Sequence, residues 1–215
     1  MPARLLPDDD VGHLEAIAVL RSGGLVALPT DTVYGLAVAL DAPDALARLF
    51  AAKERPLDKA VVLLVDGLDQ VEAVAEVGPA ARTLAARGWP GGLTLVLPQR
   101  PDAGLPAVLT AGTPTIGLRL PDHPAPRALA RALGPLPVSS ANRSGELEAR
   151  DAAGVLAQLG ERIELVLDGG PARGGVPSTV VDCSGERPRL LRAGAIPTEA
   201  LAAALDAADL AHDLA

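Results

Sequence analysis

Three short segments of the chain place hydroxyl, cationic and amide side chains where separate elements are expected to end. They are residues 29–36, which include Thr30 and Thr32, residues 53–59, and residues 139–142. Hydroxyl and amide groups donate and accept hydrogen bonds, while Lys and Arg supply fixed positive charge. Together they suit a small polar substrate that carries anionic groups.

Thr30 and Thr32 directly follow an apolar run, residues 25–28. Residues two apart in extended backbone face the same side, so both hydroxyls could meet one ligand. Such a cluster is also typical of a turn capped by an Asp or Thr side chain, and by itself this segment favours the turn. The two segments downstream reverse that preference.

Lys53 and Arg55 would point to nearly opposite sides of a continuing helix. Pro56 disfavours helical geometry at Arg55, so we expect the chain to leave the helix there and both cations to reach one anion. Lys59 adds a third positive group. The fork of donors on Arg matches phosphate oxygens, which makes a phosphate the natural ligand. The plain alternative is a solvated basic helix end that offsets the helix dipole.

No standard nucleotide-binding motif accompanies these cations. The chain has neither a Gly-x-x-x-x-Gly-Lys-Ser/Thr segment nor a Gly-x-Gly-x-x-Gly segment between a strand and a helix. A nucleotide would therefore be bound in an unconventional way.

Further polar groups follow other expected strands. Residues 139–145, Ser-Ser-Ala-Asn-Arg-Ser-Gly, could hydrogen-bond a ribose, a phosphate or an amino-acid carboxylate, and Ser178 is in a similar position. Arg119 and Arg192 lie near strand ends, where a buried guanidinium needs an anionic partner. Capped turns and a structural carboxylate explain these groups equally well.

The composition indicates one globular domain with an aliphatic core. The chain has 215 residues, of which 49% are hydrophobic and only 1% aromatic, so Ala, Val and Leu must fill the core. The formal net charge of -8 argues against a surface that follows a long polyphosphate backbone. Any basic site must be local.

Neither a disulfide nor a protein-built metal site is expected. Cys183 is the only cysteine and lies in an expected strand, which is typical of a buried, inert thiol. The three histidines are scattered, without the paired spacing of a zinc site. No apolar run approaches the roughly 20 residues that a membrane-spanning helix needs, and no signal sequence is evident, so a cytoplasmic location is the default.

Strand-length apolar runs alternate with helical patterns, which predicts an α/β domain. The glycine-rich segment 168–175 is expected to be a connection. The expected strands are residues 25–28, 60–65, 94–97, 115–120, 137–139, 164–167, 179–183 and 189–192. The expected helices are residues 14–20, a helix from about 43 that Pro56 ends, 71–77, 80–87, 125–133, 151–159 and an Ala-rich helix over about 197–211.

Four blocks of the chain resemble the YrdC/Sua5 family of L-threonylcarbamoyladenylate synthases over residues 15–197. They are residues 29–36, 53–59, the Arg119 and Ser-Ala-Asn parts of 115–142, and 178–194. The resemblance implies a twisted mixed β-sheet flanked by helices, with an open concave active-site face. It also implies a nucleotidyltransferase that condenses L-threonine, bicarbonate and ATP to threonylcarbamoyl-AMP and pyrophosphate.

The same resemblance implies roles for particular residues. Lys53 and Arg55 correspond to catalytic positions, and Mg²⁺ is expected to arrive with ATP. Leu64 stands where longer members often have a histidine that contacts threonine. No general base is assigned. The implied threonine contacts are Thr32, Arg119, Ser140 and Ser178, and the implied ATP contacts are Arg55, Lys59, Thr115, Asn142, Arg150 and Arg192.

The resemblance further implies the cellular context. Longer members carry an additional C-terminal domain, whereas this sequence ends at Ala215, soon after the last of the four blocks. The chain is therefore expected to be the single-domain form, residues 1–215. Its product would pass to a tRNA threonylcarbamoyltransferase complex, with weak or indirect contact to tRNA and none to membranes.

Three other interpretations stay open. One is a YciO-like paralogue with weak or different nucleotide-dependent activity, against which Lys53, Arg55, Ser140 and Asn142 argue. Another is an RNA-binding module, against which the net charge and the single Trp, Tyr and Phe argue. The third is the related domain of hydrogenase maturation proteins, which belongs to much longer chains.

Overall fold

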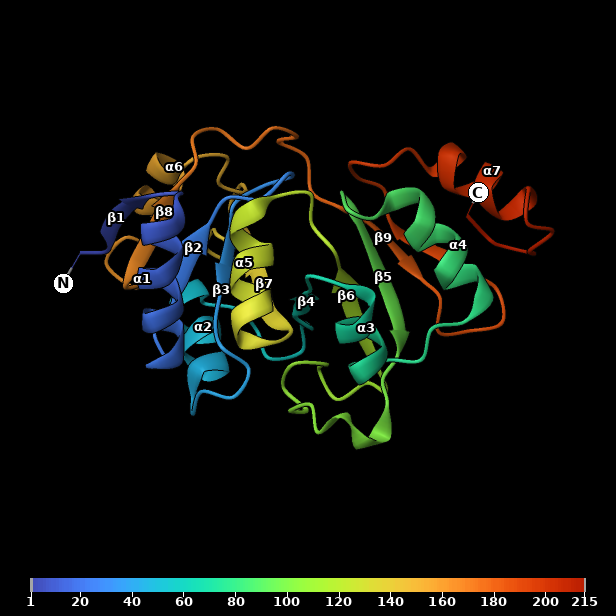
Figure 1. The fold of residues 1–215 in the computed structure, drawn as a ribbon, viewed down its shortest axis with the longest axis horizontal. Helices are drawn as coiled ribbons and strands as arrows, with labels where there is room; N and C mark the ends of the chain where they lie inside the picture. The colour runs from blue at the N-terminus through green and yellow to red at the C-terminus, as the bar shows by residue number, and fades with distance from the viewer. Residues whose placement is uncertain (1, 215) are drawn as a thin grey trace.

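A computed structural model describes residues 2–214, and its framework is one 10-stranded mixed sheet. The strand order is β1-β8-β2-β3-β7-β4-β6-β5-β9-β10. β1 and α7 lie at opposite ends of the molecule (Figure 1). The strands are β1 (Arg4–Pro7), β2 (Val26–Leu28), β3 (Gly35–Ala37), β4 (Val62–Leu64), β5 (Leu93–Pro98), β6 (Thr115–Arg119), β7 (Leu136–Ser140), β8 (Leu165–Asp168), β9 (Thr179–Asp182) and β10 (Arg189–Arg192).

Helices cover both faces of the first half of the sheet. One set of side chains of β2, β3, β7 and β8 packs with α1 and α5, which lie side by side. The alternate side chains of β2, β3 and β8 pack with α2 and α6. The helices are α1 (Asp10–Arg21), α2 (Ala45–Lys53), α3 (Leu68–Val74), α4 (Pro79–Gly88), α5 (Pro124–Leu133), α6 (Ala152–Leu159), α7 (Thr198–Asp206) and a short 3₁₀ helix, η1 (Pro101–Ala103).

The second half of the sheet is covered mainly on one face. Leu93, Leu95 and Leu97 of β5 belong to the same core cluster as residues of α3, α4 and α7. Thr94, whose side chain points to the opposite face, lines a cavity instead. This arrangement confirms the predicted twisted mixed sheet and leaves the cavity next to the central strands.

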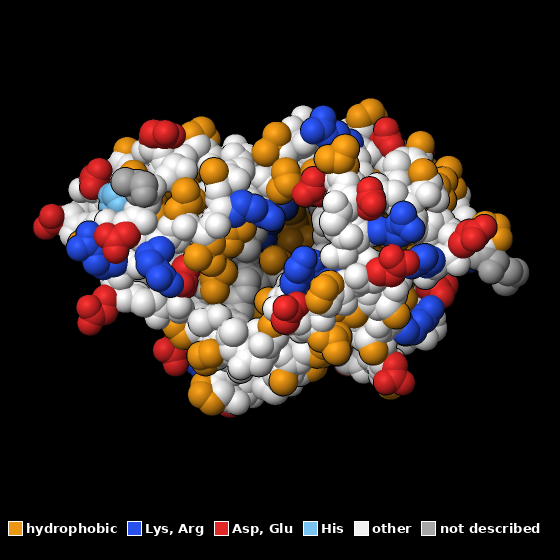
Figure 2. Space-filling model, turned by 180° about the vertical axis from the view of Figure 1, so that it is seen from behind, with side chains coloured by type: hydrophobic (Ala, Val, Ile, Leu, Met, Phe, Trp, Pro, Cys, Tyr) orange, Lys and Arg blue, Asp and Glu red, His pale blue; other side chains and the backbone are white. Residues whose placement is uncertain are grey.

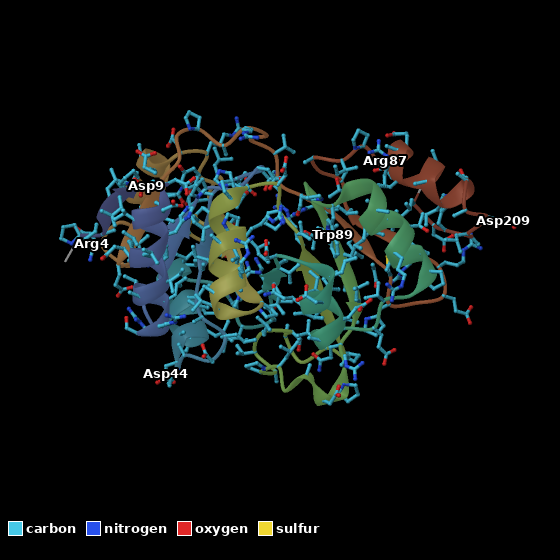
Figure 3. All side chains as sticks on the ribbon, viewed as in Figure 1. Arg4, Asp9, Asp44, Arg87, Trp89 and Asp209 are labelled. Atoms are coloured by element: carbon cyan, nitrogen blue, oxygen red, sulfur yellow. The ribbon has the colours of Figure 1, made fainter. Side chains whose placement is uncertain are left out.

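The predicted helices and strands are present, with shifts at their ends. α1 begins at Asp10 rather than near residue 14, because Asp9 caps it by accepting a 2.8 Å hydrogen bond from the backbone N–H of Gly12 (Figure 3). α2 ends at Lys53, before Pro56. The next residue, Glu54, adopts a left-handed conformation with φ 52°. The Ala-rich helix ends at Asp206 rather than near residue 211.

Two strands were not predicted. β1 is an edge strand with mostly exposed side chains, so it lacks a strong apolar pattern. β3 has only three residues and lies inside the polar segment 29–36. β4 lies inside the strand expected over residues 60–65. Leu63 belongs to one core cluster and Leu64 to the other, and Val62 and Leu64 also line the cavity. Across residues 2–214, none of the helices has the length and apolar character to cross a membrane.

Candidate functional site

A cavity of about 250 Å³ lies against the central strands, and the segments that line it come from both halves of the sheet. The back of the molecule has a hollow near its centre, flanked by Lys and Arg side chains (Figure 2). The polar side chains that line the cavity are Thr30, Thr32, Tyr34, Arg55, Thr94, Arg119, Ser139, Ser140, Glu148, Ser178 and Arg192.

Arg119, at the end of β6, is buried and held from three sides. It donates to the Asp31 carboxylate at 2.6 Å, to Thr32 Oγ1 at 2.7 Å and to the backbone carbonyl of Gly91 at 2.9 Å. Burial lowers the pKa of Arg119, and the Asp31 carboxylate opposes that shift. A guanidinium has five N–H donors, so two remain for a ligand in the cavity.

The turn that carries Thr30 and Thr32 is both capped and part of the cavity wall. Thr30 Oγ1 accepts from the backbone N–H of Thr32 at 3.1 Å and donates to the carbonyl of Val33 at 2.7 Å. The two hydroxyl oxygens are 3.0 Å apart. The two interpretations of this segment are therefore compatible, since the cap fixes the hydroxyls that face the cavity.

Ser178 and Arg192 form the wall contributed by β9 and β10. Arg192 donates twice to the backbone carbonyl of Ser178, at 2.8 and 3.1 Å, and once to its Oγ at 3.1 Å. Ser178 Oγ also lies 2.8 Å from Thr94 Oγ1. Burial lowers the pKa of Arg192, and Glu148 opposes the shift.

Of the three cations at and after the end of α2, only Arg55 lines the cavity. Its Nη2 donates to the carbonyl of Ala60 at 2.7 Å, and its guanidinium carbon lies 6.0 Å from the centre of the Phe50 ring. These contacts fix the guanidinium at the end of the helix. Lys59 is exposed and lies outside the wall.

Lys53 lies beneath the cavity rather than in its wall. It is 1% exposed, and its Nζ donates to the backbone carbonyls of Ser140 and Asn142. Burial, followed by the charge of Arg55, lowers its pKa to about 7. Lys53 therefore holds the segment that carries Ser140 against the end of α2.

The predicted site residues fall into two groups. Thr115 starts β6 whereas Arg119 ends it, a separation of about 13 Å along an extended strand. Asn142 is buried, and its Nδ2 donates to the carbonyls of Arg143 and Glu146, which positions that loop. Arg55, Thr32, Arg119, Ser140, Ser178 and Arg192 line the cavity, whereas Lys53, Lys59, Thr115, Asn142 and Arg150 do not.

Two polar residues of the wall, Thr94 and Glu148, lie outside the segments predicted to carry the site, and Tyr34 lies inside segment 29–36 but had no predicted role of its own. Thr94 lies between two leucines, and no polar neighbour marks it out. For Tyr34, the only such signal is the polar turn that precedes it. Glu148 lies in a loop of mixed character. Their positions depend on long-range pairing of strands, which local sequence does not reveal. Cys183 was predicted to be a buried, inert thiol. It is partly buried, and that burial raises the pKa of its thiol to about 12.

Replacing Tyr34 by phenylalanine is expected to lower the free energy of unfolding by about 1–2 kcal/mol. The Tyr34 hydroxyl is buried, donates to the carbonyl of Gly170 at 2.8 Å and accepts from the N–H of Gly169 at 3.1 Å. Its loss leaves two backbone groups of the 168–175 connection without these partners. Urea unfolding measures the change, and hydrogen exchange at Gly169 should be faster. Unchanged exchange would show that the hydroxyl does not anchor this connection.

A protein-family model for Sua5, YciO and YrdC proteins, described as "Telomere recombination", matches residues 18–194. The threonylcarbamoyl-AMP synthase of Bacillus subtilis (strain 168) is 42% identical over 202 residues, which are 93% of this chain and 58% of that protein. A putative threonylcarbamoyl-AMP synthase of Mycobacterium tuberculosis (strain H37Rv) is 40% identical over 202 residues, which are 93% of this chain and 92% of that protein.

The fold also matches a solved structure that contains a ligand. The crystal structure of P. abyssi Sua5 complexed with L-threonine superposes with a TM-score of 0.89 at 35% sequence identity. The match covers 95% of this chain and 61% of the Sua5 chain. The chain thus spans less than two thirds of this protein and of the Bacillus protein, but most of the Mycobacterium protein.

Proposed function

Because the chain belongs to the Sua5/YciO/YrdC family, we propose that it is an L-threonylcarbamoyladenylate synthase, a nucleotidyltransferase that joins L-threonine, bicarbonate and ATP. The observation that carries the proposal is the cavity itself. Arg119, Arg55 and Arg192 place three positive charges around a space of about 250 Å³ that is also lined by hydroxyl groups. This is a suitable site for two anionic reactants that must meet.

The threonine half of the site is built around Arg119. Its two remaining N–H donors suit a carboxylate, which a guanidinium binds through parallel hydrogen bonds. The hydroxyls of Thr32, Ser140 and Ser178 line the same cavity, next to the polar groups of a threonine bound there. Leu64 provides an apolar wall for its methyl group. The L-threonine complex of P. abyssi Sua5 supports threonine as a ligand of this fold.

The nucleotide half is built around Arg55 and Arg192. Pockets that enclose drug-sized ligands measure about 300–1,000 Å³, so this cavity is too small to enclose threonine and the whole of ATP. The reacting phosphate would lie inside, and the rest of the nucleotide would extend through the mouth. Lys59 and Arg150 are exposed outside the cavity wall, on segments that also carry wall residues, which suits contact with those outer parts.

The reaction proceeds in two bond-forming steps. The threonine amine, after losing one proton to solvent, attacks bicarbonate, and a carbamate forms with release of water. A carbamate oxygen then attacks the α-phosphorus of ATP, and the bond to pyrophosphate breaks. Both steps bring anions together, so fixed positive charge and positioning lower the barrier. Mg²⁺ carried by ATP neutralises part of the phosphate charge.

Pyrophosphate release by the purified protein tests the proposal. We expect release with ATP and Mg²⁺ only when both threonine and bicarbonate are present, and little release when serine replaces threonine. Arg55→Ala should lower the rate at least about tenfold, because a charge-assisted hydrogen bond contributes about 1.5–3 kcal/mol. Arg82→Ala is the matched control, since Arg82 is exposed and pairs with Glu72 outside this cavity.

Pyrophosphate release that does not depend on threonine and bicarbonate would contradict the proposal, as would the absence of release under any condition. The first result would favour a YciO-like nucleotide-dependent activity. The second, combined with RNA binding that weakens steeply with salt, would favour an RNA-binding module. In the cell, the product would serve a tRNA threonylcarbamoyltransferase complex, and direct contact with tRNA is not required by this site.

A further inference from the structure

Glu148 is the one carboxylate among the described residues that line the cavity. The other charged side chains of the wall are Arg55, Arg119 and Arg192. A carboxylate in a site for phosphates repels them unless a cation lies between the two. The presence of Glu148 therefore indicates that a positively charged group arrives with the substrates.

The fold holds Glu148 in this position. The backbone carbonyl of Leu147 accepts from Gln158 Nε2 at 3.0 Å, and that of Ala149 accepts from the N–H of Tyr34 at 3.0 Å. One residue further out, Asn142 Nδ2 donates to the carbonyl of Glu146 at 2.8 Å. The peptide groups on both sides of Glu148 are thus fixed by three separate elements.

The carboxylate itself is left available for a ligand. Within residues 2–214 it has neither a hydrogen-bond partner nor an ion pair, although the side chain is only partly exposed and lines the cavity. Structural carboxylates elsewhere in the chain are engaged. Asp31 bonds to Arg119, and Asp66 bonds to Arg127 and Arg131. Glu148 differs from them in being positioned but unpaired.

Two cationic substrate groups could meet this carboxylate: the threonine ammonium and the metal ion that accompanies ATP. Glu148 lies on the loop between two implied ATP contacts, Asn142 and Arg150, and Asn142 Nδ2 donates to the Glu146 carbonyl of that loop at 2.8 Å. The carboxylate that pairs with Arg119 is instead Asp31, at 2.6 Å. The ammonium of threonine is attached next to the carboxylate that Arg119 would bind. Glu148 is therefore on the nucleotide side, which favours the metal ion.

We propose that Glu148 supplies the protein's oxygen ligand to the Mg²⁺ ion that ATP carries into the cavity. The donor chemistry fits, because Mg²⁺ in phosphate sites takes one or two carboxylates, phosphate oxygens and several waters. When bound, the ion neutralises charge on the phosphates. The inference rests on the proposed synthase function, since that function brings a nucleotide triphosphate to this wall.

Mn²⁺ binding in the presence of a non-hydrolysable ATP analogue tests this assignment without turnover. Electron paramagnetic resonance of Mn²⁺ reports the bound and free ion. Glu148→Gln should raise the dissociation constant for Mn²⁺ in the ternary complex at least about tenfold, and Glu148→Asp should raise it less. Glu146→Gln is the matched control, since its exposed side chain has the same charge, lies two residues away and is outside the cavity wall.

Activity gives an independent reading. In Glu148→Gln, the Mg²⁺ concentration for half-maximal pyrophosphate release should rise by a similar factor, with the KM for threonine unchanged. An unchanged Mn²⁺ affinity together with a raised KM for threonine would overturn the proposal and assign Glu148 to the ammonium. If the wild-type protein turns over but the variant keeps its metal affinity, only this inference fails. If the wild-type protein binds neither the analogue nor the metal, the proposed function fails with it.

Discussion

Replacing Arg119 by alanine is expected to lower kcat/KM for threonine at least about a hundredfold, because two charge-assisted hydrogen bonds to the substrate carboxylate are lost. The same change should lower the free energy of unfolding by about 3–5 kcal/mol, because breaking a buried ion pair leaves the other charge uncompensated. The side chains of Arg119 and Asp31 are only 8% and 13% exposed, and their ion pair measures 2.6 Å. Pyrophosphate release and urea unfolding measure the two effects.

A double variant separates binding from stability. In Arg119→Ala with Asp31→Asn, the orphaned carboxylate is removed, so most of the lost stability should return while threonine turnover stays low. Arg4→Ala is the control, because Arg4 lies at the outer edge of the sheet in an exposed pair with Glu15 (Figure 3). Such a pair contributes only about 0–1 kcal/mol. Recovery of turnover in the double variant would show that Arg119 serves stability alone and does not bind threonine.

The sequence predicted the α/β architecture well because its strongest patterns are local. The helix expected over residues 125–133 is α5, Pro124–Leu133, and the strand expected over 94–97 is β5, Leu93–Pro98. Each is long enough for its apolar period to be visible. β3 escaped prediction because three residues, Gly-Leu-Ala, carry no period. Its existence depends on antiparallel pairing with β2 and β7, and the β7 residues it pairs with lie about a hundred positions away along the chain.

The candidate site was predicted only in part, because its contacts also depend on residues far apart in the sequence. Thr32 and Arg119 were each expected near a strand end, and the sheet does bring them together at 2.7 Å. For Lys53, the sequence correctly marked a cation but could not reveal its environment. Its hydrogen-bond acceptors are backbone carbonyls 87 and 89 residues away, and every residue has a carbonyl, so no sequence pattern identifies them. Glu148 was missed because only the folded loop directs it into the cavity.

Replacing Lys53 by methionine is expected to remove a pH-dependent part of the stability. The pKa of Lys53 is about 7 in the folded protein, against 10.5 for an ordinary lysine. Between these values the unfolded chain binds more protons than the folded one, so stability rises with pH. Above pH 10.5 Lys53 is uncharged in both states and its burial has no charge-related cost. As the pH falls from 10.5 to about 7, this cost grows and stability is lost. Each pH unit within the window corresponds to about 1.4 kcal/mol.

Unfolding by urea between pH 7 and pH 9 measures this effect. The free energy of the wild-type protein relative to Lys53→Met should rise by about 2 kcal/mol over that range. The pH range ends at 9 because the pKa values of Cys183 and Tyr34 are both raised to about 12. These two groups lower the stability as the pH rises above about 9 and 10, respectively. Lys59→Met is the matched control, since Lys59 is exposed and its curve should run parallel to the wild type.

The same variant tests how Lys53 contributes to the site. Without its Nζ, the carbonyls of Ser140 and Asn142 lose the donor that holds this segment against α2. Because Ser140 lines the cavity, turnover should fall at least about tenfold even at pH 9, where Lys53 in the wild-type protein is mostly uncharged. A positioning role predicts this loss at both ends of the pH range. A loss confined to pH 7 or below would instead show that the positive charge of Lys53 acts on the phosphates, and that its hydrogen bonds to the segment are dispensable.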